Sequence, residues 1–147
     1  MSDAAFASAS SYVGIRYDSL PAAFAFQSGA VLPKSAGAMT GVFDVDRIRT
    51  PRGDRVWLDS IIRVPGQPRP TRIVRAELKV PPLATDERLV LASCEINEAS
   101  DPRVVAIIVV KPDSTHATTV RQAWRADVKA GRFEVIPVTG MVCAEPG

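Results

Sequence analysis

The sequence predicts a mainly β protein made of antiparallel, hairpin-rich sheets, sandwich- or barrel-like in architecture. Three observations support this prediction. Runs rich in valine and isoleucine recur between residues 41 and 138. Breakers that contain proline, glycine or asparagine separate these runs. In residues 71–80 apolar side chains alternate with charged ones from Val74 to Val80, which is the period of a half-buried strand.

The length of 147 residues favours one domain with an ordinary hydrophobic core. Residues 1–11 are rich in alanine and serine without periodicity, so we expect a flexible tail there and a single β-rich domain over residues 12–147. Short apolar clusters between residues 12 and 40 indicate one or two short strands, with a short helix over residues 20–26 as the alternative.

A β-hairpin is predicted next. Residues 41–49 and 55–63 are strand-like and flank the five-residue loop Thr50–Asp54. This loop contains Arg-Gly-Asp at residues 52–54, the tripeptide that adhesion receptors read. We interpret it as turn chemistry, because glycine supplies a positive φ and aspartate bonds to nearby amides. The proline-rich residues 64–70 indicate a loop or a sheet edge.

The second half of the chain continues the pattern. Residues 88–96 read as one strand, and residues 103–110 are apolar on both faces, as in a central strand. Residues 115–138 are ambiguous. We predict a hairpin that turns at residues 129–131, and the alternative is an α+β fold with one helix near 115–130.

One stretch of this half carries a resemblance. Residues 101–110, followed by 120–143, are similar to the C-terminal half of small, uncharacterised, often exported proteobacterial proteins. The shared positions are Ala123, Trp124, Arg125, Asp127, Gly131, Arg132, Phe133 and Cys143. The resemblance covers about residues 88–145 and favours the hairpin and a disulfide. It implies no activity.

Positive charge is concentrated in one segment. Between residues 47 and 75 eight arginines stand against two aspartates, whereas the whole chain has a net charge of +2. Side chains of one parity share a strand face, so Arg47 and Arg49 point together, and Arg55 and Arg63 are expected to extend their patch from the partner strand. With Arg52, these residues form a possible site for an anion or a partner.

Other candidate sites are weaker. Cys94 and Cys143 permit one disulfide, which an exported protein would form and a cytosolic one would not. The only histidine, His116, lies too far from either cysteine for a usual zinc site, and we expect no metal and no cofactor. Asp44 and Asp46 share a strand face and are expected to pair with neighbouring arginines. Trp57 and Trp124 are expected in the core.

The sequence therefore predicts a small non-enzymatic accessory or structural protein that acts through a protein–protein surface, with an unknown protein or a second copy as partner. The alternative is an Arg-rich hairpin over residues 47–75 that binds nucleic acid or another polyanion. No catalytic constellation is recognisable, so we expect no enzyme. The longest apolar run, residues 104–110, is too short to span a membrane. The chain as given is expected to be cytoplasmic, or periplasmic or secreted if a leader has been removed.

Overall fold

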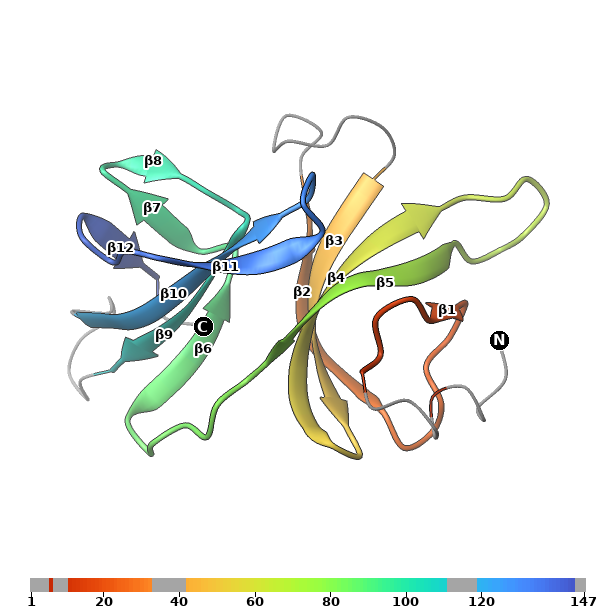
Figure 1. The fold of residues 1–147 in the computed structure, drawn as a ribbon, viewed down its shortest axis with the longest axis horizontal. Helices are drawn as coiled ribbons and strands as arrows, with labels where there is room; N and C mark the ends of the chain where they lie inside the picture. The colour runs from red at the N-terminus through yellow and green to blue at the C-terminus, as the bar shows by residue number, and fades with distance from the viewer. Residues whose placement is uncertain (1–5, 7–10, 33–41, 111–118, 145–147) are drawn as a thin grey trace. The chain divides into compact units, whose positions relative to one another are not determined.

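The computed structural model describes Phe6 and residues 11–32, 42–110 and 119–144. Almost all of its regular structure is β, arranged in three antiparallel sheets (Figure 1). This confirms the predicted mainly β fold. The chain divides into two compact units, one of residues 1–80 and 128–132 and the other of residues 81–127 and 133–147.

The first unit contains a five-stranded sheet in the order β1-β5-β4-β3-β2. Its three long central strands lie side by side in Figure 1 and pair over eight or nine residues. The short β1 and the longer β2 form the two edges. The strands are β1 (Arg16–Tyr17), β2 (Ala25–Val31), β3 (Val42–Thr50), β4 (Gly53–Ile62) and β5 (Thr71–Lys79).

The β3–β4 hairpin is tighter than predicted. Thr50 pairs with Gly53, so only Pro51 and Arg52 lie outside the ladder in place of the five expected residues. The Thr50 hydroxyl donates to the Gly53 carbonyl at 2.8 Å and accepts from the Arg52 amide at 3.1 Å. Gly53 has a φ of 107°, which side-chain-bearing residues rarely adopt. Glycine is therefore present for turn geometry, as expected.

A bulge interrupts the predicted alternation of β5. Leu58 pairs with Ala76 but the next residue, Asp59, pairs with Val74, so Arg75 has no partner in the ladder. Val74 and Ala76 therefore point to opposite faces of the sheet, and the prediction that they share one face is wrong. The Arg75 side chain instead donates to the Ser60 hydroxyl at 2.9 Å.

The N-terminal segment packs on one face of this sheet through aromatic side chains. Phe6 is only 3% exposed and contacts Tyr12, Tyr17 and Phe24. The expected tail at residues 1–11 therefore contributes at least one core residue, and most of its other residues lie outside the described part. Residues 20–24 form a turn that leads into β2, so the alternative of a helix at 20–26 is wrong.

The second unit contains two smaller antiparallel sheets, ordered β11-β10-β9-β6 and β12-β7-β8. β9 lies between β10 and β6, as expected for its apolar residues. β10 and β11 form the predicted hairpin, so the helix alternative is wrong over residues 119–127. The strands are β6 (Glu87–Leu91), β7 (Cys94–Ile96), β8 (Ala99–Ser100), β9 (Val104–Val109), β10 (Thr119–Asp127), β11 (Arg132–Ile136) and β12 (Met141–Cys143).

The single strand predicted over residues 88–96 is divided into β6 and β7, which belong to different sheets. Ala92 causes the break, because its φ of 58° turns the chain out of the extended conformation. Its amide still donates to the carbonyl of Val104 at 3.2 Å. Apolar pattern alone did not reveal this break.

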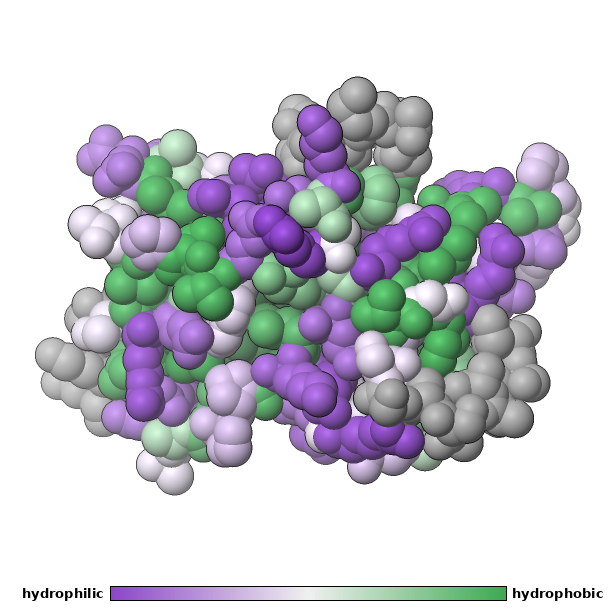
Figure 2. All heavy atoms as spheres, viewed as in Figure 1, coloured by the Kyte–Doolittle hydropathy of each residue, from purple (hydrophilic) through white to green (hydrophobic). Residues whose placement is uncertain are grey.

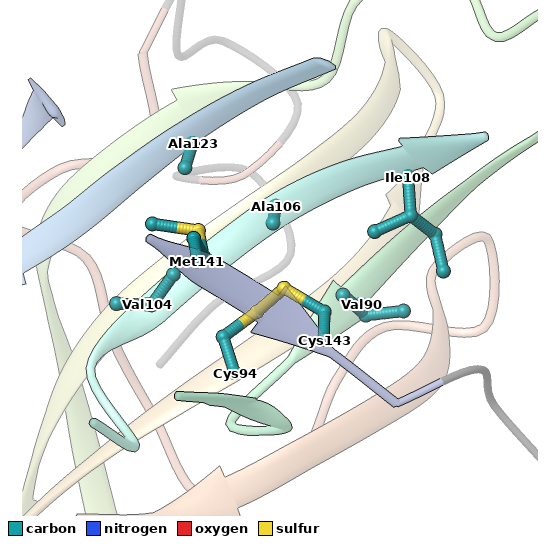
Figure 3. Packing of buried hydrophobic residues seen from close by; sticks show 8 residues of the cluster. All are labelled: Val90, Cys94, Val104, Ala106, Ile108, Ala123, Met141 and Cys143. Carbon is teal, nitrogen blue, oxygen red and sulfur yellow. A yellow bond between two sulfur atoms is a disulfide. The ribbon is translucent and has the colours of Figure 1, made fainter. Parts of the chain in front are cut away.

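A compact core fills the second unit (Figure 3). Cys94 of β7 and Cys143 of β12 are bonded to each other, and their Cα atoms are 4.0 Å apart. Six other buried residues surround the two sulfur atoms in this cluster: Val90, Val104, Ala106, Ile108, Ala123 and Met141. Trp57 and Trp124 are both buried, in agreement with the sequence prediction.

Candidate functional site

Three aspartates meet on the face of the first sheet that carries the aromatic cluster. Asp44 of β3 pairs directly with Asp59 of β4, and Asp46 lies two residues further along the same face. All three are buried. One carboxylate oxygen from each residue lies within 4.8 Å of the others. We call Asp44, Asp46 and Asp59 the acidic trio.

Two neighbouring side chains donate to the acidic trio. Arg72 of β5 donates from Nε to Asp44 Oδ2 at 3.1 Å, and the Tyr17 hydroxyl of β1 donates to Asp59 Oδ2. The second oxygen of each of these carboxylates, Asp44 Oδ1 and Asp59 Oδ1, is buried without a hydrogen-bond partner among the described residues. The trio is therefore only partly neutralised.

Burial and crowding of like charges disfavour ionisation here. Burial, reinforced by the charges of Asp44 and Asp59, raises the pKa of Asp46 to about 9. Burial also raises the pKa of Asp59 to about 7, although the hydrogen bond from Tyr17 opposes this rise. The pKa of Asp44 is raised by burial against the opposing charge of Arg72. Such carboxyls can share a proton or bind a cation.

A cavity of about 440 Å³ opens beside the trio. Asp44, Asp46 and Arg72 line it together with apolar residues that include Phe26 and Val31 of β2. Gly29 of β2 pairs with Asp46, and a Cβ at Gly29 would overlap the Asp46 carboxylate. Glycine at this position therefore leaves the room that the Asp46 carboxylate occupies. We call this space the acidic cavity.

The structure separates the predicted arginine patch. Arg47 and Arg49 share one face of β3, as expected from their parity. Arg55 pairs with Ile48 and therefore lies on the opposite face, with the acidic trio. Arg47 bonds to Asp54 at 2.8 Å, and Arg55 is buried with its Nε 3.7 Å from Glu77. Arg49, Arg52 and Arg63 are exposed.

The remaining predicted residues are placed as follows. Asp44 contacts Arg72 rather than the expected Arg47 or Arg49. Cys94 and Cys143 are bonded to each other. His116 lies outside the described residues. In the Arg-Gly-Asp tripeptide, only Arg52 is fully in the turn, while Gly53 begins β4 and Asp54 is bonded to Arg47.

Strand β2 forms an unusual edge beside the acidic cavity. Its side chains are almost all exposed, with Phe26 at 59% and Val31 at 62%, and none of them is charged. No other strand of the described chain pairs with its outer side. Elsewhere, polar and apolar residues are interspersed over the face shown in Figure 2.

Sequence reasoning placed Asp44 and Asp46 on one face but missed Asp59, Tyr17 and Arg72. Local pattern carries no signal for Tyr17 or Arg72, which reach the trio from other strands. The hairpin register would have indicated Asp59, because Asp59 pairs with Asp44 only if the turn is short.

Comparison with protein-family models, curated proteins and solved structures gave no match to this chain. Within the described ranges no helix is long and apolar enough to cross a bilayer. The acidic cavity and the β2 edge are therefore the two features that bear on function.

Proposed function

We propose that this protein is a small non-enzymatic accessory protein that associates through its exposed strand β2, and that its partner is the β2 strand of a second copy. The observation that carries this proposal is the uncharged, exposed edge. Exposed edge strands normally carry charges, bulges or prolines that prevent pairing with other chains. The opposite edge of the same sheet follows this rule, because β1 has two residues and one is Arg16.

The backbone geometry of β2 supports strand addition. The Leu32 amide donates to the Phe43 carbonyl, so by alternation the polar backbone groups of Ala30 also point toward β3. The backbone polar groups of Gly29 and Val31 then point away from β3, toward the open edge of the sheet. The register shift lies between Phe26 and Ser28, which leaves residues 28–31 as a regular segment for pairing.

A second copy suits this edge better than a charged partner strand. Because β2 has no charged side chain, two antiparallel copies place no like charges opposite each other. With a two-fold axis between the copies, the outward backbone groups of each β2 strand would bond to those of the other. The exposed Phe26 and Val31 would lose water contact on pairing.

Sedimentation over a wide protein concentration range tests this proposal. We expect a reversible dimer for the wild type and a monomer for Val31→Lys, which puts a charge on each copy of the edge. Val135→Lys is the matched control, because Val135 is a valine of similar exposure on β11 of the other unit. A wild type that stays monomeric, or equal effects of the two substitutions, would refute pairing through β2.

The alternative, polyanion binding by the arginine segment, has weaker support. Arg47 is bonded to Asp54, and Arg55 is buried on the face opposite to Arg47 and Arg49. Two of the proposed arginines are therefore held by acidic partners, and they cannot act from one surface. If this alternative held, binding to duplex DNA would fall steeply with salt, and Arg49→Ala would flatten that dependence.

A further inference from the structure

The acidic trio has two buried oxygen atoms that no other group of the described chain satisfies. Asp44 is 3% exposed and Asp59 is 0% exposed, yet Oδ1 of each has no hydrogen-bond partner among the described residues. A buried carboxylate oxygen without a partner costs free energy, because it has lost its bonds to water and no hydrogen bond or ion contact replaces them. A cation or a hydrogen-bond donor beside these two atoms would offset that cost.

We propose that the acidic trio binds one divalent cation, and that calcium is the best fit. This inference is independent of the pairing proposed for β2. One oxygen from each aspartate lies within 4.8 Å of the others. Calcium takes about six to eight oxygen ligands at about 2.3–2.6 Å in flexible geometry, and carboxylates are among its usual ligands. The three neighbouring carboxylate oxygens supply the core of such a donor set.

Magnesium fits less well. It demands near-ideal octahedral geometry and usually keeps several waters, with only one or two carboxylates among its ligands. The donor set contains only carboxylate oxygens, which are hard ligands. Zinc and copper prefer nitrogen or sulfur ligands, and the trio offers neither.

The charge balance of the site agrees with a divalent ion. Three carboxylates face one guanidinium, that of Arg72, whose Nε lies 3.1 Å from Asp44 Oδ2. A divalent ion compensates the remaining two negative charges when all three aspartates are ionised. Arg72 and Tyr17 each hold the Oδ2 atom of one aspartate, which leaves Oδ1 available as a ligand.

The acidic cavity has room for the water ligands that a calcium ion needs in addition to the three protein oxygens. Calcium takes about six to eight ligands, so water must complete the coordination. Asp44 and Asp46 line the cavity, and its volume of about 440 Å³ is enough for several water molecules and an entry path. The absence of a side chain at Gly29 keeps space for Asp46.

A shared proton is the competing explanation. A protonated Asp46 could donate to Asp44, which would satisfy at most one of the two orphaned oxygens. Satisfying Asp59 Oδ1 as well would require a second proton. A cation in contact with all three residues satisfies both atoms at once.

Terbium luminescence tests this proposal on the full chain after treatment with EDTA and removal of the chelator. Terbium replaces calcium in oxygen sites and is sensitised by a nearby aromatic ring. The Tyr17 hydroxyl is bonded to Asp59, so its ring lies close to the proposed ion. We expect sensitised emission at one terbium per chain, displacement by calcium at lower concentration than by magnesium, and a higher unfolding temperature with calcium.

Asp59→Asn and Asp46→Asn should abolish the emission and the stabilisation by calcium. Each removes one carboxylate ligand while keeping the side-chain shape, so circular dichroism should show folded protein. Asp54→Asn is the control, because Asp54 lies in the same hairpin but its side chain bonds to Arg47. Tyr17→Phe should weaken calcium binding by about 10- to 100-fold, because it frees a ligand that Tyr17 orients. Absent emission and absent stabilisation in the wild type, or an unchanged response in folded Asp59→Asn, would overturn the proposal.

Discussion

The stability of the cation-free protein should fall as pH rises, because the acidic trio resists ionisation. The pKa of Asp46 is raised from 3.8 to about 9, so the folded chain keeps a proton that the unfolded chain releases. For a group shifted in this direction, the stabilisation is complete below about pH 4 and is lost progressively up to about pH 9.

The size of the effect follows from the linkage between protons and folding. Each such proton costs about 1.4 kcal/mol of unfolding free energy per pH unit. From about pH 5 to about pH 8, Asp46 alone would therefore remove about 4 kcal/mol. Asp59 adds to the slope up to about pH 7, where its raised pKa lies. This is a large part of the 5–15 kcal/mol that is typical of a folded protein.

Urea denaturation in EDTA at a series of pH values measures this slope. A Trp124→Phe background leaves Trp57, which is buried in the first unit, as the fluorescent reporter. Asp46→Asn should reduce the slope by the contribution of one proton and should be more stable than the wild type at about pH 8. Asp54→Asn should keep the wild-type slope. A flat wild-type profile, or an Asp46→Asn profile as steep as the wild type, would refute the reasoning.

Three other predictions concern the disulfide, Gly29 and Ile108. Replacing both Cys94 and Cys143 by alanine should lower the unfolding free energy of the second unit by about 4 kcal/mol, measured by urea denaturation, because their bond closes a loop of 49 residues. Gly29→Ala should leave the fold intact by circular dichroism but abolish terbium emission, since the new methyl group displaces the Asp46 carboxylate. Ile108→Ala should cost about 2–5 kcal/mol in the same denaturation assay, because Ile108 is completely buried; a loss below 1 kcal/mol would contradict its place in the core.

The sequence predicted the strands better than their register. Valine- and isoleucine-rich runs located β3, β4, β5 and β9, because burial of apolar side chains decides where these strands form. The break at Ala92 was missed, since an alanine with positive φ has no local signature.

One error in the predicted loop length explains why Arg55 and Asp59 were both assigned to the wrong face of the sheet. A five-residue loop would pair Arg49 with Arg55, whereas the observed turn pairs Arg49 with Asp54. A shift of one residue turns every side chain of β4 to the other face. The predicted register therefore placed Arg55 in the arginine patch and placed Asp59 on the face opposite to Asp44. This shift of one residue is why the sequence did not predict the acidic trio.

The bond between Cys94 and Cys143 also determines how the chain would respond to mechanical force. The two residues are 49 positions apart, and β8, β9, β10 and β11 lie between them. If the two ends of the chain were pulled, the disulfide would carry the force, and the loop of chain between Cys94 and Cys143 would carry none. Since an extended chain spans about 3.4 Å per residue, roughly 170 Å of chain would not extend until a reductant broke the disulfide.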